Sequence, residues 1–228
     1  MTTVIAPTDD AFTVASGTSA RAGELRLCWS PRSPFVRRVM VAAHELGLAE
    51  RITCIDTVVG MTGCHAQLMR INPLNKIPTL ITDDGFVLSD TTLICQYLDG
   101  IAPAPRLFPQ SHRARMQSMR WHALGHGLTD LLVLWRNERL RPAEQQHAPT
   151  LAAWRAKYDA TLVTLDREAG TLAGAPLCIG QIAIACAVGY LDFRFPDLAW
   201  RDNVPALADW FGTFDRRASM RATLPAGG

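Results

Sequence analysis

Residues 72–80 read NPLNKIPTL, and this stretch decides how the first half of the chain is interpreted. Pro78 stands directly before residues 79–82, an apolar run that predicts a strand. If the Ile77–Pro78 bond is cis, the backbone of Ile77 turns outward, and its N–H and C=O can pair with a peptide-like ligand. The alternative is that Pro78 only marks the start of an edge strand. The segments on either side of this stretch therefore decide between the two.

These flanking segments alternate between strand and helix patterns. Apolar residues recur at helical spacing from Pro34 to Leu46, and Gly47 ends that pattern. The turn Asp83-Asp84-Gly85 between two apolar runs is a strong short signal of a hairpin. Strands are predicted at residues 25–29, 52–58, 79–82 and 86–88, and helices at 34–46, 65–70 and 90–98. The resulting order, βαβαββα, predicts an α/β domain over residues 25–99.

The composition changes after this domain. Residues 100–110 carry three prolines and predict a linker. Helical periodicity follows at about 111–140, 150–172, 181–193 and 204–217, which predicts an all-α domain over residues 111–228. Residues 1–24 are rich in Ala, Thr, Ser and Gly without periodicity, so we expect a disordered extension, and they lack the basic and apolar segments of a signal peptide.

Charge, hydropathy and cysteine spacing argue against several classes of function. The net charge is +2, from 23 basic and 21 acidic residues, which is too little for a nucleic-acid-binding surface. No apolar run is long enough to span a membrane. The six cysteines are scattered and form no C-x-x-C pair, so neither a disulfide framework nor a zinc site is expected. Reduced, buried thiols predict a cytoplasmic protein.

Ser33 stands directly before Pro34 at the start of the first predicted helix. Serine is a favoured N-cap and proline a favoured first helical residue, so a purely structural role explains both. The same position faces backbone N–H groups and the positive end of the helix dipole, which stabilise an anion such as a thiolate. A hydroxyl that donates to the sulfur lowers the pKa of the thiol further from its usual value of about 8.5. Ser30 is a rival, but only Ser33 adjoins the helix.

Asp90 and Thr91 stand at the start of another predicted helix. An acidic residue at this place caps the helix, which is again a structural explanation. A carboxylate and a hydroxyl at a helix start also bind the ammonium and carboxylate groups of an amino acid. This position therefore predicts a binding site for the charged end of a peptide-like ligand.

Taken in order and at these spacings, the three features resemble the glutathione transferase superfamily, in its bacterial, serine-type, cytosolic form. The resemblance covers nearly the whole chain from Leu25 onward, and residues 72–78 match the family motif N-P-x-x-K-[VI]-P. It implies a thioredoxin-like N-terminal domain, an all-α C-terminal domain and a homodimer. Glutathione is the implied co-substrate, with no other cofactor. One departure is Cys178-Ile179-Gly180-Gln181 where the family often has a [ST]-I-A-D capping box, so this helix start is expected to be weaker.

The resemblance also assigns roles to individual residues. Ser33 contacts the glutathione sulfur, Ile77 pairs with the cysteinyl backbone beside a cis Pro78, and the pair Asp90-Thr91 holds the γ-glutamyl end. Thr91 replaces the more usual serine and keeps the hydroxyl. The implied glutathione-binding residues are Ser33, Phe35, Lys76, Ile77, Pro78, Asp90 and Thr91.

The helical domain contributes candidates for a pocket that holds the second substrate. His122 and His126 have helical i, i+4 spacing, but without a third ligand no metal site is expected. For the two tryptophans on the same helix, packing within the bundle is the alternative role. The residues expected to line an electrophile pocket between the domains are Phe35, Trp121, His122, His126 and Trp135.

The function that follows is a glutathione S-transferase, an enzyme that activates the glutathione thiol for attack on a small hydrophobic electrophile, as in detoxification. One alternative is a specialised glutathione-dependent isomerase, dehalogenase or ether-cleaving enzyme, because the same thiolate serves all of these. Another is a non-catalytic member that binds glutathione or a protein partner. Thiol exchange through a mixed disulfide is disfavoured because Ser33 has no sulfur.

Overall fold

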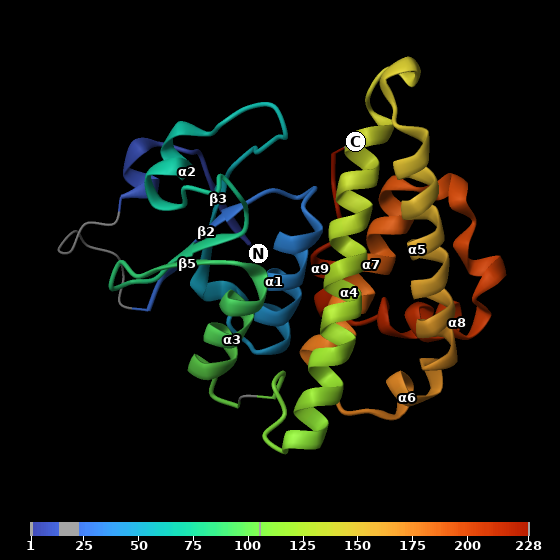
Figure 1. The fold of residues 1–228 in the computed structure, drawn as a ribbon. Helices are drawn as coiled ribbons and strands as arrows, with labels where there is room; N and C mark the ends of the chain where they lie inside the picture. Colours follow the sequence, from blue (N-terminus) through green and yellow to red (C-terminus); the bar gives the residue numbers. More distant parts are fainter. Residues whose placement is uncertain (1, 14–22, 105, 228) are drawn as a thin grey trace. The chain divides into compact units, whose positions relative to one another are not determined.

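The computed structural model describes residues 2–13, 23–104 and 106–227, and the chain divides into two compact units (Figure 1). The first unit comprises residues 1–106 and 223–228, and the second comprises Leu107–Ala222. The last residues return to the first unit because the Ala226 N–H donates to the Pro31 carbonyl at 3.4 Å. The first unit holds the sheet, and the second is helical.

Five strands form a mixed sheet in the order β1-β3-β2-β4-β5. The central strands β2 and β3 run parallel, whereas β4 is antiparallel to both β2 and β5. The predicted hairpin between β4 and β5 is present: Gly85 has a φ of 82°, and the Thr82 N–H donates to the Phe86 carbonyl at 2.9 Å. The strands are β1 (Thr3–Ile5), β2 (Leu25–Trp29), β3 (Ile52–Asp56), β4 (Thr79–Ile81) and β5 (Val87–Ser89).

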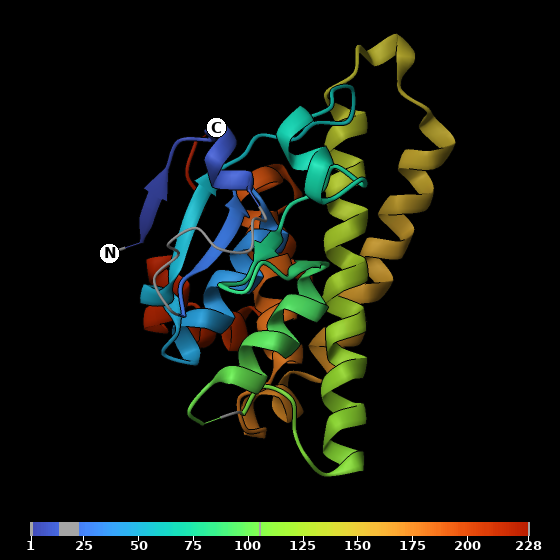
Figure 2. The same ribbon diagram turned by 90° about the vertical axis from the view of Figure 1, so that its left-hand side faces the viewer.

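The N-terminal segment corrects one expectation. Residues 1–24 were expected to be disordered, yet β1 pairs in parallel with β3 and a 3-10 helix, η1 (Asp9–Phe12), follows it (Figure 2). Composition fails here because order comes from pairing with a distant strand and from burial of a single aromatic ring, that of Phe12. The rest of this segment, residues 14–22, lies outside the described residues.

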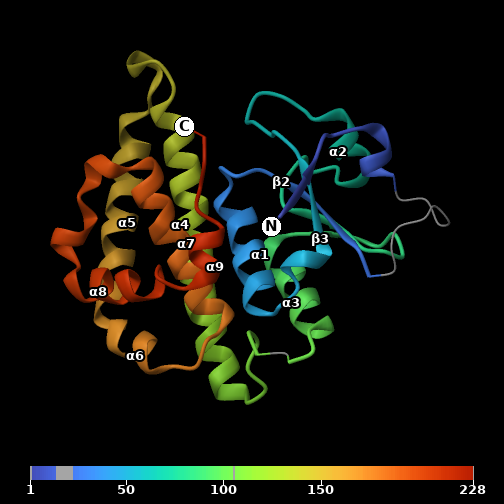
Figure 3. The ribbon, with the colours of Figure 1, turned by 180° about the vertical axis from the view of Figure 1, so that it is seen from behind.

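Three helices flank the sheet: α1 (Pro34–Glu45), α2 (Ala66–Ile71) and α3 (Thr91–Ile101). Helices α1 and α3 lie together on one side, while α2 and η1 lie on the other (Figures 1 and 3). Alternating residues of β2, such as Leu25 and Leu27, are fully buried, as are Ile94 and Leu98 of α3. The helix α3 ends at Ile101, so the predicted linker, which began at residue 100, overlaps its last turn.

The second unit is a helical bundle with α7 at its centre. Every residue from Ile179 to Leu191 is buried, and α7 packs along α4. The helices are α4 (His112–Arg139), α5 (Ala148–Arg167), α6 (Ala169–Gly174), α7 (Ile179–Arg194), α8 (Pro205–Phe214) and α9 (Ala218–Ala222). Short 3-10 segments are η2 (Ala49–Arg51), η3 (Ala143–Gln145), η4 (Pro196–Leu198) and η5 (Trp200–Asn203). The predicted helices thus correspond to α4, to α5 with α6, to α7 and to α8.

Helix α4 approaches α7 closely because it carries a glycine at the contact. A Cβ atom on Gly125 would lie 2.5 Å from the Ala183 carbonyl carbon and 2.6 Å from the Ile184 nitrogen. The start of α7 forms a capping box, in which the Cys178 N–H donates to Gln181 Oε1 at 2.8 Å and the Cys178 side chain faces the Gln181 N–H. Gln181 therefore compensates for part of what the sequence departure removes.

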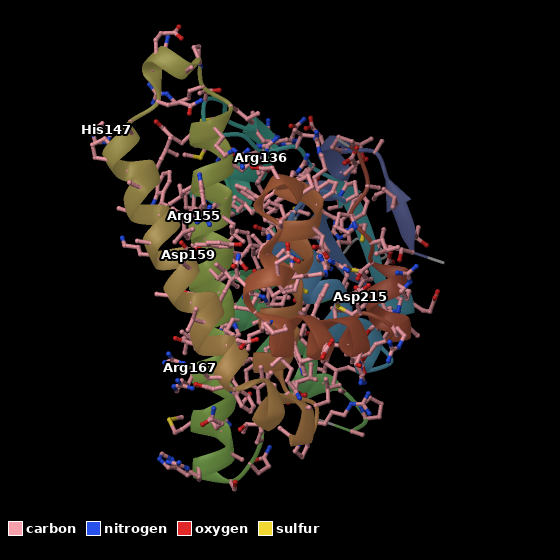
Figure 4. The ribbon with its side chains drawn as sticks, turned by 90° about the vertical axis from the view of Figure 1, so that its right-hand side faces the viewer. Arg136, His147, Arg155, Asp159, Arg167 and Asp215 are labelled. Carbon is pink, nitrogen blue, oxygen red and sulfur yellow. The ribbon has the colours of Figure 1, made fainter. Side chains whose placement is uncertain are left out.

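Charged side chains of the bundle pair on its surface. Arg155 and Asp159 form an i, i+4 ion pair at 2.9 Å along α5 (Figure 4). On α4, Arg120 pairs with Glu168 at 2.6 Å, and Arg139 pairs with Asp197 at 3.0 Å. Such pairing is typical of a solvated helix face. Among the described residues, none of the helices has both the length and the apolar character needed to cross a bilayer.

Candidate functional site at one end of the sheet

The strand register brings the three predicted site segments to the same end of the sheet. Cys28, Thr79 and Ser89 lie in one row across β2, β4 and β5. Just beyond this row, β2 continues into the loop that ends at Ser33, β4 is preceded by Ile77–Pro78, and β5 is followed by Asp90. Segments that are far apart in sequence therefore meet at the same end of the sheet. Sequence spacing alone does not establish this.

Ser33 is the N-cap of α1, as its position before Pro34 predicts. Its Oγ accepts a hydrogen bond from the Val36 N–H at 3.3 Å. This bond uses a lone pair of the oxygen, so the hydroxyl proton remains available to a ligand. Ser33 is half-buried and lies at the positive end of a twelve-residue helix. It therefore combines a donor with a favourable field for an anion.

The two neighbouring candidates, Ser30 and Cys28, are both buried. Ser30 is buried, and its Oγ accepts from the Arg32 N–H at 3.4 Å. Burial raises the pKa of the Cys28 thiol to about 12, so this cysteine stays protonated near neutral pH. Of the three side chains, only Ser33 offers a partly exposed polar group at the helix start.

The Ile77–Pro78 peptide bond is cis, the isomer that the family resemblance implies. Among the described residues, neither the N–H nor the C=O of Ile77 has a hydrogen-bond partner. A short piece of backbone with both groups unpaired is suited to pair with the backbone of a peptide. The neighbouring Lys76 carbonyl, by contrast, accepts from Asn72 Nδ2 at 3.1 Å and from Thr79 Oγ1 at 2.8 Å.

Sequence reasoning gave no role to the asparagines of this loop. The buried Asn72 side chain bonds the Lys76 carbonyl and also donates to Thr79 Oγ1 at 2.9 Å. Asn75 adopts a φ of 52°, and its Oδ1 accepts from the His65 N–H at 2.9 Å. The signal in the sequence that could have identified this role is the preference of asparagine for local side-chain–backbone hydrogen bonds. Together they fix the loop that carries Ile77.

Asp90 caps α3 with one of its two carboxylate oxygens. Oδ1 accepts from the Thr92 N–H at 2.7 Å and from the Leu93 N–H at 3.3 Å. Its φ of 83° is rare for a non-glycine residue and costs about 1–3 kcal/mol of strain. Asp90 is exposed, whereas Thr91 is only 2% exposed, so the predicted threonine hydroxyl lies beneath the surface. Of this pair, the Asp90 carboxylate is therefore the group that is accessible to a ligand.

The two remaining predicted residues of this unit flank these anchors. Lys76 is exposed, and within the described part of the chain its ammonium has no ion-pair partner. Phe35 is the second residue of α1 and half-buried, with the Arg38 guanidinium 5.9 Å from the centre of its ring. In sequence, a cation thus adjoins Ile77, and an apolar ring stands two residues after Ser33.

The pocket candidates of the helical unit are partly engaged in packing. Trp121 donates its Nε1–H to Glu168 at 2.7 Å, and the ring of Trp135 lies 5.7 Å from that of Tyr158. These are the contacts of bundle packing, the alternative that the sequence left open. The rings of His122 and His126 lie 5.6 Å apart. Within the described residues, no three His, Cys, Asp or Glu side chains gather to hold a metal ion.

Known proteins resemble both units. The model of the glutathione S-transferase N-terminal domain matches residues 32–101, and that of the C-terminal domain matches residues 148–213. A curated relative, the uncharacterized GST-like protein YibF of Escherichia coli (strain K12), is 30% identical over 204 residues, which are 88% of this chain and 98% of the relative. The chain belongs to the glutathione S-transferase family. The thioredoxin-like first unit and the helical second unit of this chain are the family's fold.

Solved structures extend this relationship. A glutathione transferase family member from Pseudomonas fluorescens Pf-5, crystallised with bound glutathione, is 39% identical to this chain with a TM-score of 0.86. The match covers 90% of this chain and 100% of that one. A glutathione S-transferase from Methylobacillus flagellatus KT, also with glutathione bound, is 31% identical, with a TM-score of 0.79 over 89% of this chain and 100% of that one.

Proposed function

We propose that this transferase binds glutathione at the end of its sheet and activates the thiol for attack on a small hydrophobic electrophile. The observation that carries the proposal is the row formed by Cys28, Thr79 and Ser89. This row brings Ser33, Ile77 and Asp90 to the same end of the sheet. A thiolate site, a peptide-backbone site and a site for a charged amino-acid end in one place match the three parts of glutathione. The glutathione bound to the Pseudomonas fluorescens and Methylobacillus flagellatus proteins supports the same ligand here.

Each anchor has a distinct chemical task in this proposal. The Ser33 hydroxyl donates to the sulfur, and the N-terminus of α1 adds its positive field, so both favour the thiolate over the thiol. The N–H and C=O of Ile77 pair with the cysteinyl backbone, beside Pro78. The Asp90 carboxylate accepts from the ammonium of the γ-glutamyl group, and Thr91 stands next to it in the chain. Lys76 pairs with a carboxylate of the ligand.

The reaction is a displacement or an addition at carbon. The thiol proton leaves to solvent before attack, and the sulfur electron pair forms the new S–C bond. With an aryl halide, the halide leaves with the electrons of its bond to carbon, so no oxidant, reductant or metal is required. Phe35, which is half-buried on α1, is the proposed contact of the electrophile on the first unit, and no cofactor beyond glutathione is proposed.

We also propose that the protein is a cytoplasmic homodimer. None of the six cysteines, all of which lie among the described residues, is in a disulfide, which is consistent with a reducing compartment. Phe86 is 59% exposed and Leu93 is 45% exposed on the first unit, so both apolar side chains are available for a second copy to cover. Light scattering after size exclusion measures the mass, and a monomer at micromolar concentration would rule out the dimer.

The test of the proposed function separates binding from catalysis. Calorimetry measures the affinity for glutathione, and a panel of aryl halides, epoxides and unsaturated carbonyl compounds measures turnover. Binding together with conjugation is the expected result. Binding with no turnover across the panel would indicate a non-catalytic glutathione-binding member, and turnover confined to isomerisation, dehalogenation or ether cleavage would indicate a specialised enzyme. No binding at millimolar glutathione would refute the proposal.

A further inference from the structure

Residues 3–13, which we call the strap, belong to the first unit and contact both its sheet and its helix α2. At the sheet edge, Thr3, Val4 and Ile5 pair with Thr53, Cys54 and Ile55 of β3 (Figure 2). Further along, η1 lies beside α2 (Figures 1 and 3). The strap therefore joins the edge of the sheet to the helix that precedes the Ile77 loop.

Arg26 on β2 holds the end of the strap. Its guanidinium donates to three backbone carbonyls within four residues: those of Asp10 at 3.2 Å, Ala11 at 2.8 Å and Thr13 at 2.7 Å. A planar guanidinium with several fixed donors suits such an arrangement, whereas the single ammonium of lysine does not. These bonds fix the backbone on both sides of Phe12.

Phe12 packs against the residue that caps α2. Its side chain is buried, and its ring centre lies 5.3 Å from that of His65. His65 is the N-cap residue of α2, and its Nδ1 accepts from the Leu68 N–H at 3.2 Å. The imidazole can only accept this bond while its ring keeps one orientation, and the phenylalanine ring packed against it maintains that orientation.

The backbone of His65 connects the strap to the Ile77 loop. Its N–H donates to Asn75 Oδ1 at 2.9 Å, and Asn75 Nδ2 donates to the Gly63 carbonyl at 3.1 Å. Asn75 stands two residues before Ile77, whose backbone has no partner within the described residues. A continuous chain of contacts thus runs from Phe12 through His65 and Asn75 to the loop that presents Ile77.

We infer that the strap positions the Ile77 loop for ligand binding, and that Phe12 is the positioning residue through which it acts. The inference rests on the proposed function, because it concerns the affinity of the glutathione site. Without the Phe12 ring, α2 loses the support of its cap, and the loop adopts its binding conformation in a smaller fraction of molecules. An affinity falls in proportion to the fraction that is competent to bind, so a fraction of about one tenth raises the glutathione Kd about tenfold.

The experiment compares Phe12→Ala with three matched variants of the full chain. Phe12→Leu restores an apolar side chain. Asp9→Asn alters an exposed residue of the same 3-10 helix, and this aspartate forms a 3.8 Å ion pair with Arg70. Phe214→Ala makes the same change at a buried phenylalanine of the helical unit. Glutathione Kd by calorimetry, kcat at saturating glutathione, and amide hydrogen exchange over residues 65–76 are measured for each.

In Phe12→Ala alone, we expect a rise of about tenfold in glutathione Kd and faster amide exchange over residues 65–76, with kcat at saturating glutathione unchanged. In Phe12→Leu, we expect the Kd to recover in part. A Kd within twofold of the wild type in folded Phe12→Ala, or an equal rise in Phe214→Ala, would overturn the inference. If Phe12→Ala does not fold, Arg26→Lys loosens the strap while keeping the ring and has the same expected and opposing results. A wild-type chain that binds no glutathione would instead overturn the proposed function, and this inference with it.

Discussion

Replacing Ser33 by alanine removes two interactions that can be measured separately. The first is the cap of α1, in which Oγ accepts from the Val36 N–H at 3.3 Å. Loss of a serine N-cap costs about 1 kcal/mol. In a unit of roughly 100 residues, this lowers the melting temperature by about 4–8 °C, so the variant is expected to fold at 25 °C.

The second interaction is the hydrogen bond from the Ser33 hydroxyl to the glutathione sulfur. A hydrogen bond to a charged group contributes about 1.5–3 kcal/mol. Because one pKa unit corresponds to about 1.4 kcal/mol, its loss raises the pKa of the bound thiol by about 1–2 units. A higher thiol pKa means less thiolate: at a pH below the thiol pKa, the thiolate fraction falls by about tenfold or more. Activity therefore recovers as the pH rises. The helix dipole remains, which limits the effect.

The assay is the pH dependence of kcat/KM for conjugation to an aryl halide, together with ultraviolet titration of the bound thiolate. Ser33→Gly is expected to reproduce the pKa rise with little loss of stability, because glycine is an adequate N-cap. Ser111→Ala removes a matched cap on α4, where Oγ accepts from the Ala114 N–H at 3.4 Å, and is expected to lower stability alone. An unshifted pH profile in Ser33→Ala would refute the role of this hydroxyl.

Three further predictions test the rest of the molecule. Asp90→Asn keeps a cap and tolerates positive φ but removes the charge, so calorimetry should show about tenfold weaker glutathione binding with little change in melting temperature, and unchanged binding would count against the Asp90 contact. Hydrogen bonds from Arg120 and Trp121 lower the pKa of the Glu168 carboxyl, so its stabilising contribution is present above the unfolded pKa of about 4.3 and lost as the pH falls through the lower folded value. Denaturant unfolding should therefore show Glu168→Gln to be less stable at pH 7 but equal to the wild type near pH 2, and a constant difference would contradict this. Gly125→Ala should lower the melting temperature because its Cβ meets backbone 2.5 Å away, whereas Gly127→Ala on the same helix meets nothing within 4 Å and should gain up to about 1 kcal/mol; equal effects would exclude close packing as the cause.

Local sequence signals predicted most of the first unit. The β2 and β3 strands, the hairpin at Gly85 and the caps at Ser33 and Asp90 are each specified by residues within a few positions of one another, and all are present. The start of α7 was also recognised, including the part that Gln181 plays. Features of this kind depend on turn chemistry and capping, which a single sequence carries directly.

Features that depend on distant partners were not predictable in the same way. The order in β1 and η1 arises from pairing with Ile52–Asp56 and from contact between Phe12 and His65, neither of which leaves a periodic pattern. The convergence of Ser33, Ile77 and Asp90 is set by strand register, whereas local sequence patterns predict only the order of these segments. For the tryptophans, helical spacing is the same whether a ring packs in the bundle or lines a pocket.

The pairing of β1 with β3 also has a consequence for self-association. In its absence β3 would be the edge of the sheet, and the segment Ile52–Asp56, which reads ITCID, would present a row of unpaired N–H and C=O groups. A β-branched segment at an open edge is a template for strand addition by another molecule. By covering this edge, the three residues of β1 disfavour strand addition by another molecule. A chain that lacks residues 2–13 is therefore expected to lose solubility before it loses its fold.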